Sequence, residues 1–329
     1  MKASRLLPVL ETLLTQPRAV CLWGAPGVGK SAVVRETGEK LGLPVVDLRA
    51  TLLDPTDLRG IPMLKNGQAV WCPPSFLPKA SDKPGILFLD ELNAAPPLVQ
   101  ASMYQLVLDR RIGEYVLPDG WKIIAAGNRQ SDRAVTFRMS SALANRFIHI
   151  TLDADSQSWQ DWAIKAGVHP LVTAFIRFKP KLLWHSKDGE TAFASPRSWE
   201  MLSDVVKSFG DPLAARDIFR GIVGEGPAGE FAEFARNSLS AKEIEAILAD
   251  PVNAPLPSTL DKVWTLVTRI GADAADDAVA AAGAKLLTRL QPEFAVVMAR
   301  DILTVRPAFV MNADFISFMK EHQKLFNSL

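Results

Sequence analysis

The sequence has few cysteines and no long apolar stretch, and both shortages exclude classes of protein. Only Cys21 and Cys72 occur among 329 residues, far apart and at no metal-ligand spacing, so we expect structural thiols and no disulfide. No run of about 18 apolar residues is present, and the first residues lack the apolar segment of a signal peptide. The sequence therefore predicts a cytoplasmic protein that does not span a membrane.

An excess of one charge is also missing. Lysine and arginine number 37 against 36 acidic residues, which gives a net charge of +1. This balance gives no reason to expect an extended nucleic-acid footprint or a charged membrane surface, although a local basic groove is compatible with it. The histidines have no clustered metal spacing, and we interpret them as structural: His149, His169, His185 and His322.

Apolar residues are plentiful, at 48% of the chain, and the length suggests two or three compact units. The first half contains five short apolar runs without polar alternation: 19–23, 44–48, 86–90, 122–126 and 147–152. Such runs suit strands that are covered on both faces, so they predict a parallel sheet between helices. The fold class is therefore α/β, and we expect this sheet domain over residues 1–153.

The second half of the chain reads as helical. After residue 153 the strand signals fade, and helical patterns punctuated by prolines take over. A proline-containing linker near 252–257 divides this region. We therefore expect a smaller helical domain over residues 154–250 and a C-terminal helical extension over 251–329.

The strongest motif follows the first apolar run. Residues 24–31 fit the pattern G-x-x-x-x-G-K-[ST] and precede a helical pattern over 30–41. Glycines let such a loop turn tightly, so that backbone N–H groups and the helix N-terminus converge on a phosphate. Lys30 would reach the terminal phosphates, and Ser31 would ligate Mg²⁺. The predicted nucleotide-binding residues are Gly24, Ala25, Pro26, Gly27, Val28, Gly29, Lys30, Ser31 and Ala32.

The apolar run 86–90 ends in two carboxylates, Asp90 and Glu91. In a parallel sheet this end lies at the same edge as the phosphate loop. Asp90 would hold Mg²⁺ through its water shell, while Glu91 would orient and deprotonate the attacking water. The alternative interpretation is a solvated acidic strand end.

Two further polar residues stand where they could serve phosphoryl transfer. Asn128 ends the run 122–126 and could hydrogen-bond the attacking water or the terminal phosphate; its alternative role is that of a turn residue. Arg146 follows a short apolar helix and should project from the domain edge, where it could enter the nucleotide site of a neighbouring subunit. Its alternative role is that of a surface arginine at a helix terminus.

Taken in order, these motifs together with Ser195-Pro196-Arg197 resemble the set of the AAA+ ATPases: Walker A, Walker B, sensor 1, arginine finger and sensor 2. The resemblance implies a strand order of 5-1-4-3-2 and a helical lid that carries Arg197 over the nucleotide. It also implies hydrolysis of ATP with Mg²⁺ in a homo-oligomeric ring, commonly a hexamer, with catalytic roles for Glu91, Asn128, Arg146 and Arg197. The residues do not distinguish ATP from GTP.

Segments 57–62, 71–77 and 90–97 resemble the MoxR branch in particular. In that branch a β-hairpin interrupts the second helix, which here corresponds to residues near 60–75 with Asn66-Gly67 as the turn. A further hairpin is expected near 110–120, closed near Asp119-Gly120. The resemblance implies a chaperone-like motor that remodels or activates a protein partner, often a protein with a von Willebrand factor A domain.

Alternatives stay open at this stage. Arg133 or Arg138 could share the role given to Arg146, because the stretch 127–139 is rich in arginine. A nucleic-acid motor of replication or restriction type would have the same motifs, although the near-neutral charge argues against it. A nucleotide-controlled scaffold with negligible turnover is a third hypothesis.

Overall fold

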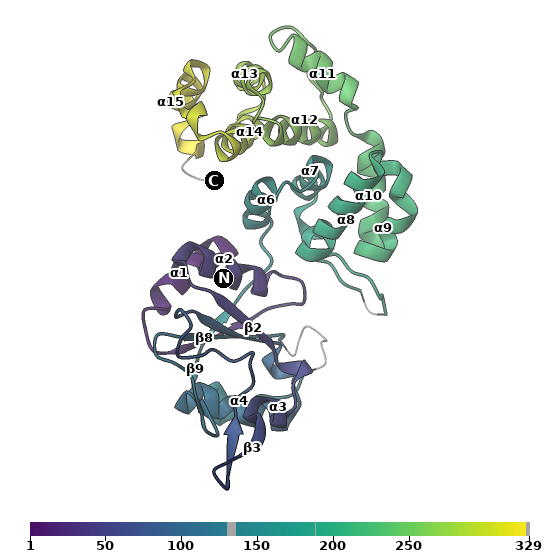
Figure 1. Cartoon of the computed structure of the whole chain (residues 1–329). Helices are drawn as coiled ribbons and strands as arrows, with labels where there is room; N and C mark the ends of the chain where they lie inside the picture. The colour runs from purple at the N-terminus through teal and green to yellow at the C-terminus, as the bar shows by residue number, and fades with distance from the viewer. Residues whose placement is uncertain (130–135, 188, 327–329) are drawn as a thin grey trace. The chain divides into compact units, whose positions relative to one another are not determined.

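A computed structural model describes residues 1–129, 136–187 and 189–326 of the chain (Figure 1). Contacts within the chain divide it into two compact units, residues 1–154 and 155–329. Within the described ranges, none of the helices combines the length and the apolar content that a bilayer crossing requires.

The first unit is built on a parallel five-stranded sheet. The strands, in spatial order, are β2 (Val45–Arg49), β5 (Ile86–Asp90), β8 (Lys122–Gly127), β1 (Ala19–Trp23) and β9 (Phe147–Thr151). Numbered along the chain, this is the predicted order 5-1-4-3-2. Each strand coincides with one of the apolar runs, so the α/β fold of a P-loop NTPase is confirmed.

Alternate side chains of each strand pack on opposite faces of this sheet. In β5, Ile86 and Phe88 join an apolar cluster with α1 (Ala3–Leu13) and α2 (Lys30–Leu41). Leu87 and Leu89 join the cluster of the other face. That face is covered by α3 (Pro55–Arg59), α4 (Pro97–Asp109) and α5 (Ser141–Ala144). Burial on both faces explains why the strand sequences are continuously apolar.

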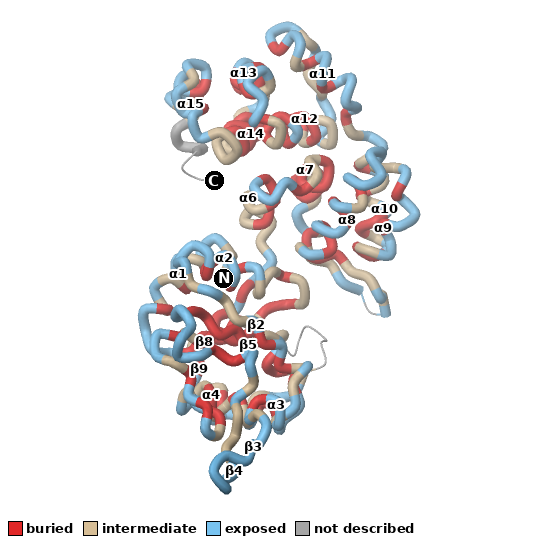
Figure 2. Tube along the Cα trace, viewed as in Figure 1, coloured by how far each residue is buried: buried red, intermediate tan, exposed pale blue. Residues whose placement is uncertain are grey.

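A β-hairpin extends from the unit between β2 and β5. Strands β3 (Ile61–Lys65) and β4 (Gln68–Cys72) pair antiparallel, and both turn residues, Asn66 and Gly67, have positive φ, 54° and 78°. This is the turn geometry that the Asn-Gly pair favours. Figure 2 shows the hairpin largely exposed; Leu64 is 83% exposed at its end.

A second, shorter hairpin pairs β6 (Arg111–Ile112) with β7 (Tyr115–Val116). Its turn is Gly113-Glu114, so the expectation of closure near Asp119-Gly120 was wrong. Gly113 has φ of 55°, which closes the turn early, whereas 119–120 form a separate turn that leads into β8. The two hairpins touch where Trp71 N donates to Glu114 Oε2 at 3.4 Å.

The second unit is helical. Its helices are α6 (Ser156–Lys165), α7 (Pro170–Phe178), α8 (Pro196–Phe209), α9 (Arg216–Val223), α10 (Glu225–Asn237), α11 (Ala241–Ala249), α12 (Leu260–Ala272), α13 (Asp277–Leu286), α14 (Pro292–Val305) and α15 (Ala313–Phe326). One apolar cluster runs from Trp159 to Phe234, and a second runs from Leu239 to Phe318. Helix α11, inside the lid range 154–250, thus packs with the second cluster. A lid distinct from an extension stays a prediction.

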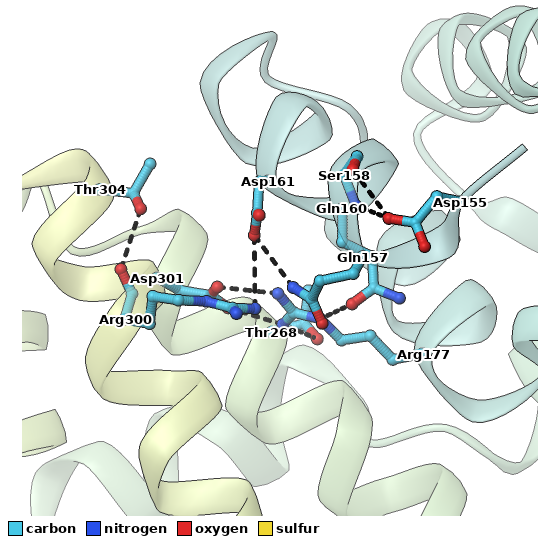
Figure 3. Close-up of polar contacts among 10 residues, drawn as sticks. All are labelled: Asp155, Gln157, Ser158, Gln160, Asp161, Arg177, Thr268, Arg300, Asp301 and Thr304. Atoms are coloured by element: carbon cyan, nitrogen blue, oxygen red, sulfur yellow. Dashed lines mark hydrogen bonds and ion pairs between the residues drawn. The ribbon is translucent and has the colours of Figure 1, made fainter. Parts of the chain in front are cut away.

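A buried ion pair connects these two clusters (Figure 3). Arg177 on α7 donates from Nη2 to Asp301 Oδ1 on α14 at 2.8 Å, and the two side chains are 1% and 4% exposed. Arg177 Nη1 donates to Thr268 Oγ1 on α12 at 2.8 Å, and Arg177 Nε donates to Gln160 Oε1 on α6 at 3.4 Å. Burial raises the pKa of the Asp301 carboxyl, and the Arg177 guanidinium opposes that rise.

Replacement of Arg177 by methionine should destabilise the second unit strongly. The change leaves Asp301 buried without its partner, which costs about 3–5 kcal/mol. Urea unfolding of the full chain, followed by far-UV circular dichroism, measures the loss. Arg216→Met, on an exposed arginine of α9 beside Asp217, is the matched control and should unfold like the parent. Parent-like unfolding of Arg177→Met would contradict a stabilising pair.

Candidate functional site

The phosphate loop connects β1 to α2 and depends on its glycines. Gly27 and Gly29 have φ of 74° and 103°, a region that other residues rarely adopt. A Cβ on Gly24 would lie 2.7 Å from the carbonyl oxygen of Leu152, so this position also needs glycine for space. Helix α2 begins at Lys30, directly after the loop, and its first N–H groups therefore face the loop.

Lys30 connects the loop with the end of β8. Its Nζ donates to the carbonyl oxygens of Gly24 and Ala25, at 2.7 and 3.2 Å, and to Asn128 Oδ1 at 2.8 Å. The pairing of β1 with β8 brings these segments together, because neighbouring parallel strands end at one edge. An ammonium group and an amide thus share the place where phosphate would be bound.

Ser31 and Asp90 are in direct contact. Ser31 Oγ donates to Asp90 Oδ2 at 2.9 Å, and the backbone N–H of Glu91 donates to Asp90 Oδ1 at 2.9 Å. A hydroxyl and a carboxylate oxygen side by side are the hard oxygen donors that Mg²⁺ prefers when it also binds substrate phosphates. The residues present therefore fit the metal that the sequence predicts.

Glu91 has a left-handed backbone conformation, with φ of 56° and ψ of 32°. Such a conformation is uncommon for a residue with a side chain and clusters at functional sites. The exposed carboxylate accepts a hydrogen bond from Thr51 Oγ1 at 2.9 Å. Thr51 follows β2, the strand beside β5, and our interpretation of the sequence missed it because no local pattern marks it.

Asn93 holds Asn128 in place and was also missed. Its Nδ2 donates to Asn128 O at 2.7 Å, and its Oδ1 accepts from Asn128 N at 3.1 Å. Asn93 is only 3% exposed. A Cβ on Gly127 would lie 2.5 Å from Asn93 Oδ1, so glycine before Asn128 lets the amide approach. The sequence shows only a polar residue just after the carboxylate pair, and nothing local identifies its burial or its partner.

Arg146 lies two residues beyond α5, and its side chain is exposed. Its backbone N–H donates to Leu143 O at 3.1 Å, which continues the last turn of the helix. Arg138 is exposed too, whereas Arg133 lies outside the described residues. The structure therefore presents Arg146 at the surface, and the choice among these arginines stays open.

Arg197 belongs to the second unit, in the first turn of α8. Ser195 caps this helix: its Oγ accepts from Ser198 N at 3.2 Å, and its own N–H donates to Ser198 Oγ at 2.7 Å. Arg197 is exposed. Its expected place over the nucleotide stays a prediction.

The cysteines, histidines and acidic residues are also candidate metal ligands. No group of three or more His, Cys, Asp or Glu side chains with metal-binding potential occurs in the part of the chain that the structure describes. Cys21 and Cys72 are free, and burial raises the pKa of the Cys21 thiol. A buried, protonated thiol in β1 is unreactive.

The five-stranded sheet and the loop between β1 and α2 have the fold of a P-loop NTPase. Residues 19–147 match the family model of the AAA domain of the dynein-related subfamily. This match begins with β1 and ends at the start of β9, so it spans the phosphate loop and the carboxylate pair. This part of the chain is therefore similar to the AAA domain of the dynein-related subfamily.

Other comparisons add little to this assignment. No curated protein matches the chain. A solved structure of NtrX from Brucella abortus is 17% identical, with a TM-score of 0.40, over 63% of this chain and 51% of that one. A structure of NtrX with bound ADP is 16% identical, with a TM-score of 0.42, and the match covers 98% of this chain and 67% of the NtrX chain. A RuvB mutant from Thermotoga maritima is 16% identical, with a TM-score of 0.37, and the match covers 82% of this chain and 80% of the RuvB chain. The chain thus spans about half of the first NtrX structure.

Proposed function

We propose that this chain is a Mg²⁺-dependent ATPase of MoxR type, which assembles into a ring and uses hydrolysis to remodel or activate a protein partner. The observation that carries the proposal is the contact of Ser31 with Asp90 at 2.9 Å, beside the contact of Lys30 with Asn128 at 2.8 Å. These two contacts join the phosphate loop to the ends of β5 and β8, which lie side by side in the sheet. Phosphoryl transfer to water requires such an arrangement of phosphate-binding, metal-binding and water-orienting groups.

Each site residue has a proposed task. The loop amides and Lys30 bind the phosphates, and Ser31 with Asp90 would hold Mg²⁺, which when bound neutralises charge on the phosphate oxygens. Glu91 takes the proton from the attacking water, and Asn128 orients that water or the terminal phosphate. Arg146 would stabilise the transition-state charge in the neighbouring subunit, and Arg197 would act from the lid.

A protein partner is supported by the exposed hairpin β3–β4. Ile61, Met63 and Leu64 are 73%, 56% and 83% exposed on a two-stranded projection. Apolar side chains concentrated on an exposed element favour contact with another protein surface over nucleic acid, for which basic residues would be needed. We propose that this partner is a protein with a von Willebrand factor A domain or another protein client.

The proposed metal site is tested by Ser31→Ala. Loss of the hydroxyl should raise the Mg²⁺ concentration for half-maximal hydrolysis about tenfold or more, as expected for one lost ligand interaction of about 1.4 kcal/mol. Phosphate release measured against Mg²⁺ concentration gives the value. Ser102→Ala, on α4, is the control and should match the parent. An unchanged Mg²⁺ requirement in Ser31→Ala would contradict the assignment.

The ring and the partner need separate measurements. Light scattering after size-exclusion chromatography with a non-hydrolysable ATP analogue should report a homo-oligomer, commonly a hexamer. Hydrolysis measured with and without a co-purified protein should rise with that protein. DNA added to the same assay should have no effect, whereas salt-dependent stimulation by DNA would favour the nucleic-acid motor instead.

A further inference from the structure

His149 and Trp23 form a polar contact on the edge of the sheet that the proposed function does not use. Trp23 ends β1 and immediately precedes Gly24 of the phosphate loop; His149 lies on β9, the neighbouring edge strand. Trp23 Nε1 donates to His149 Nδ1 at 2.8 Å, and the rings stack with centroids 5.8 Å apart and planes 24° apart. The other ring nitrogen, Nε2, lies 2.8 Å from Ala144 O.

These contacts determine the state of the imidazole. An indole N–H can only donate, so His149 Nδ1 must accept and carries no proton. The remaining proton of a neutral imidazole is then on Nε2, where it donates to the Ala144 carbonyl oxygen. Both ring nitrogens are therefore used by one tautomer, which fixes the ring plane as well as its position.

The Ala144 carbonyl matters because of its place in the chain. Ala144 is the last residue of α5, a helix of only 4 residues, and Arg146 follows two residues later. Carbonyl groups at a helix C-terminus have no partner within the helix, so the hydrogen bond from His149 satisfies one of them. It thereby ties the segment before Arg146 to β9.

Trp23 connects this edge to the nucleotide site of the same subunit. A Cβ built on Gly127 would lie 3.0 Å from Trp23 Cζ3, so the indole packs closely over the end of β8, next to Asn128. On its other side the indole holds His149. Arg146 and His149 both line an open surface hollow of ≈ 720 Å³ formed by α5 and the start of β9.

We propose that His149 is a positioning residue for Arg146, with the hydrogen bond from Trp23 fixing the orientation of the imidazole. The pair fixes the surface segment that Arg146 presents to a second copy of this chain, and it anchors that segment to the strand that carries the phosphate loop. This inference rests on the proposed function, because it requires that Arg146 acts in the site of an adjacent subunit.

His149→Phe tests the inference in the full-length protein. The ring is kept, but both hydrogen bonds are lost, so kcat for ATP should fall about 10–100-fold, in line with the cost of displacing a catalytic group by about 1 Å. KM for ATP should stay within about twofold of the parent value, because the phosphate loop of the variant is unchanged. His149→Gln, whose amide can still donate to Ala144 O, should restore part of kcat. Trp23→Phe should give an intermediate loss.

Mixing two variant proteins distinguishes a role of His149 in positioning Arg146 from a general structural role of His149. Protomers with Glu91→Gln provide an intact Arg146 but no general base, so adding them to His149→Phe protein should raise hydrolysis above that of His149→Phe alone. A merely structural defect in the His149→Phe nucleotide site would not be rescued in this way, and absence of rescue overturns the inference.

Arg146→Ala separates failure of the inference from failure of the proposed function. Parent-like kcat in Arg146→Ala would overturn both the role of Arg146 and the inference. A loss of kcat in Arg146→Ala together with parent-like kcat in His149→Phe would overturn the inference alone. In the double variant, His149→Phe should add no further loss, since its effect passes through the arginine; an additive loss also overturns the inference.

Discussion

Glu91→Gln is expected to lower ATP hydrolysis by about 10²–10⁴-fold, the usual contribution of general acid–base catalysis, while ATP remains bound. Glutamine keeps the size of the side chain and an oxygen that can accept from Thr51 Oγ1, which contacts Glu91 Oε2 at 2.9 Å. The left-handed backbone at Glu91 is not changed either. Only the ability to take a proton from water is lost, so binding and turnover should separate.

The measurement pairs phosphate release with equilibrium binding of a fluorescent ATP analogue. Glu36→Gln, on an exposed carboxylate of α2, is the matched control and should hydrolyse ATP like the parent. Tight binding with lost turnover in Glu91→Gln supports a general base. Hydrolysis at the parent rate would show that the mechanism is wrong.

Arg146→Ala should lower kcat by about 10³–10⁵-fold, the range found when an arginine that stabilises phosphoryl-transfer charge is removed. Arg146 is exposed at the end of α5 and lies outside the contacts that join the loop to Asp90 and Asn128. Binding of ATP should therefore be spared, with KM nearly unchanged. The kcat and KM values come from steady-state assays across ATP concentrations.

A mixture of two inactive variants tests whether this arginine acts between subunits. Arg146→Ala provides Glu91, and Glu91→Gln provides Arg146, so mixed rings contain sites with both groups. Hydrolysis should reappear on mixing. Arg138→Ala is compared in the same assay, because Arg138 is an exposed arginine of the same region and the alternative candidate for this role. A mixture without activity, or an equal loss in Arg138→Ala, would count against Arg146 as the acting arginine.

Much of the first unit was predictable because local sequence determines it. Strands buried on both faces need continuous apolar runs, and this is why the run 86–90 identified β5 and its burial. Carboxyl ends of parallel strands meet at one edge, which explains why Asp90 and Asn128 could both be placed beside the phosphate loop from their positions alone.

The supporting residues were not predictable, because their partners are distant in the sequence. Thr51 contacts a carboxylate 40 residues away, and Trp23 contacts His149 126 residues away. Neither pair has a local pattern, and His149 read alone is an ordinary structural histidine. The turn of the second hairpin was predicted wrongly for a different reason. Asp119-Gly120 is the stronger turn signal in the sequence, but the chain reverses earlier, at Gly113.

The buried pairing of Arg177 with Asp301 bears on how such a chain can change over generations. A substitution of Asp301 alone would leave the buried Arg177 guanidinium with Thr268 and Gln160 as acceptors but without a counter-ion. A neutral residue at one of these two positions is therefore better tolerated when the other position is neutral as well.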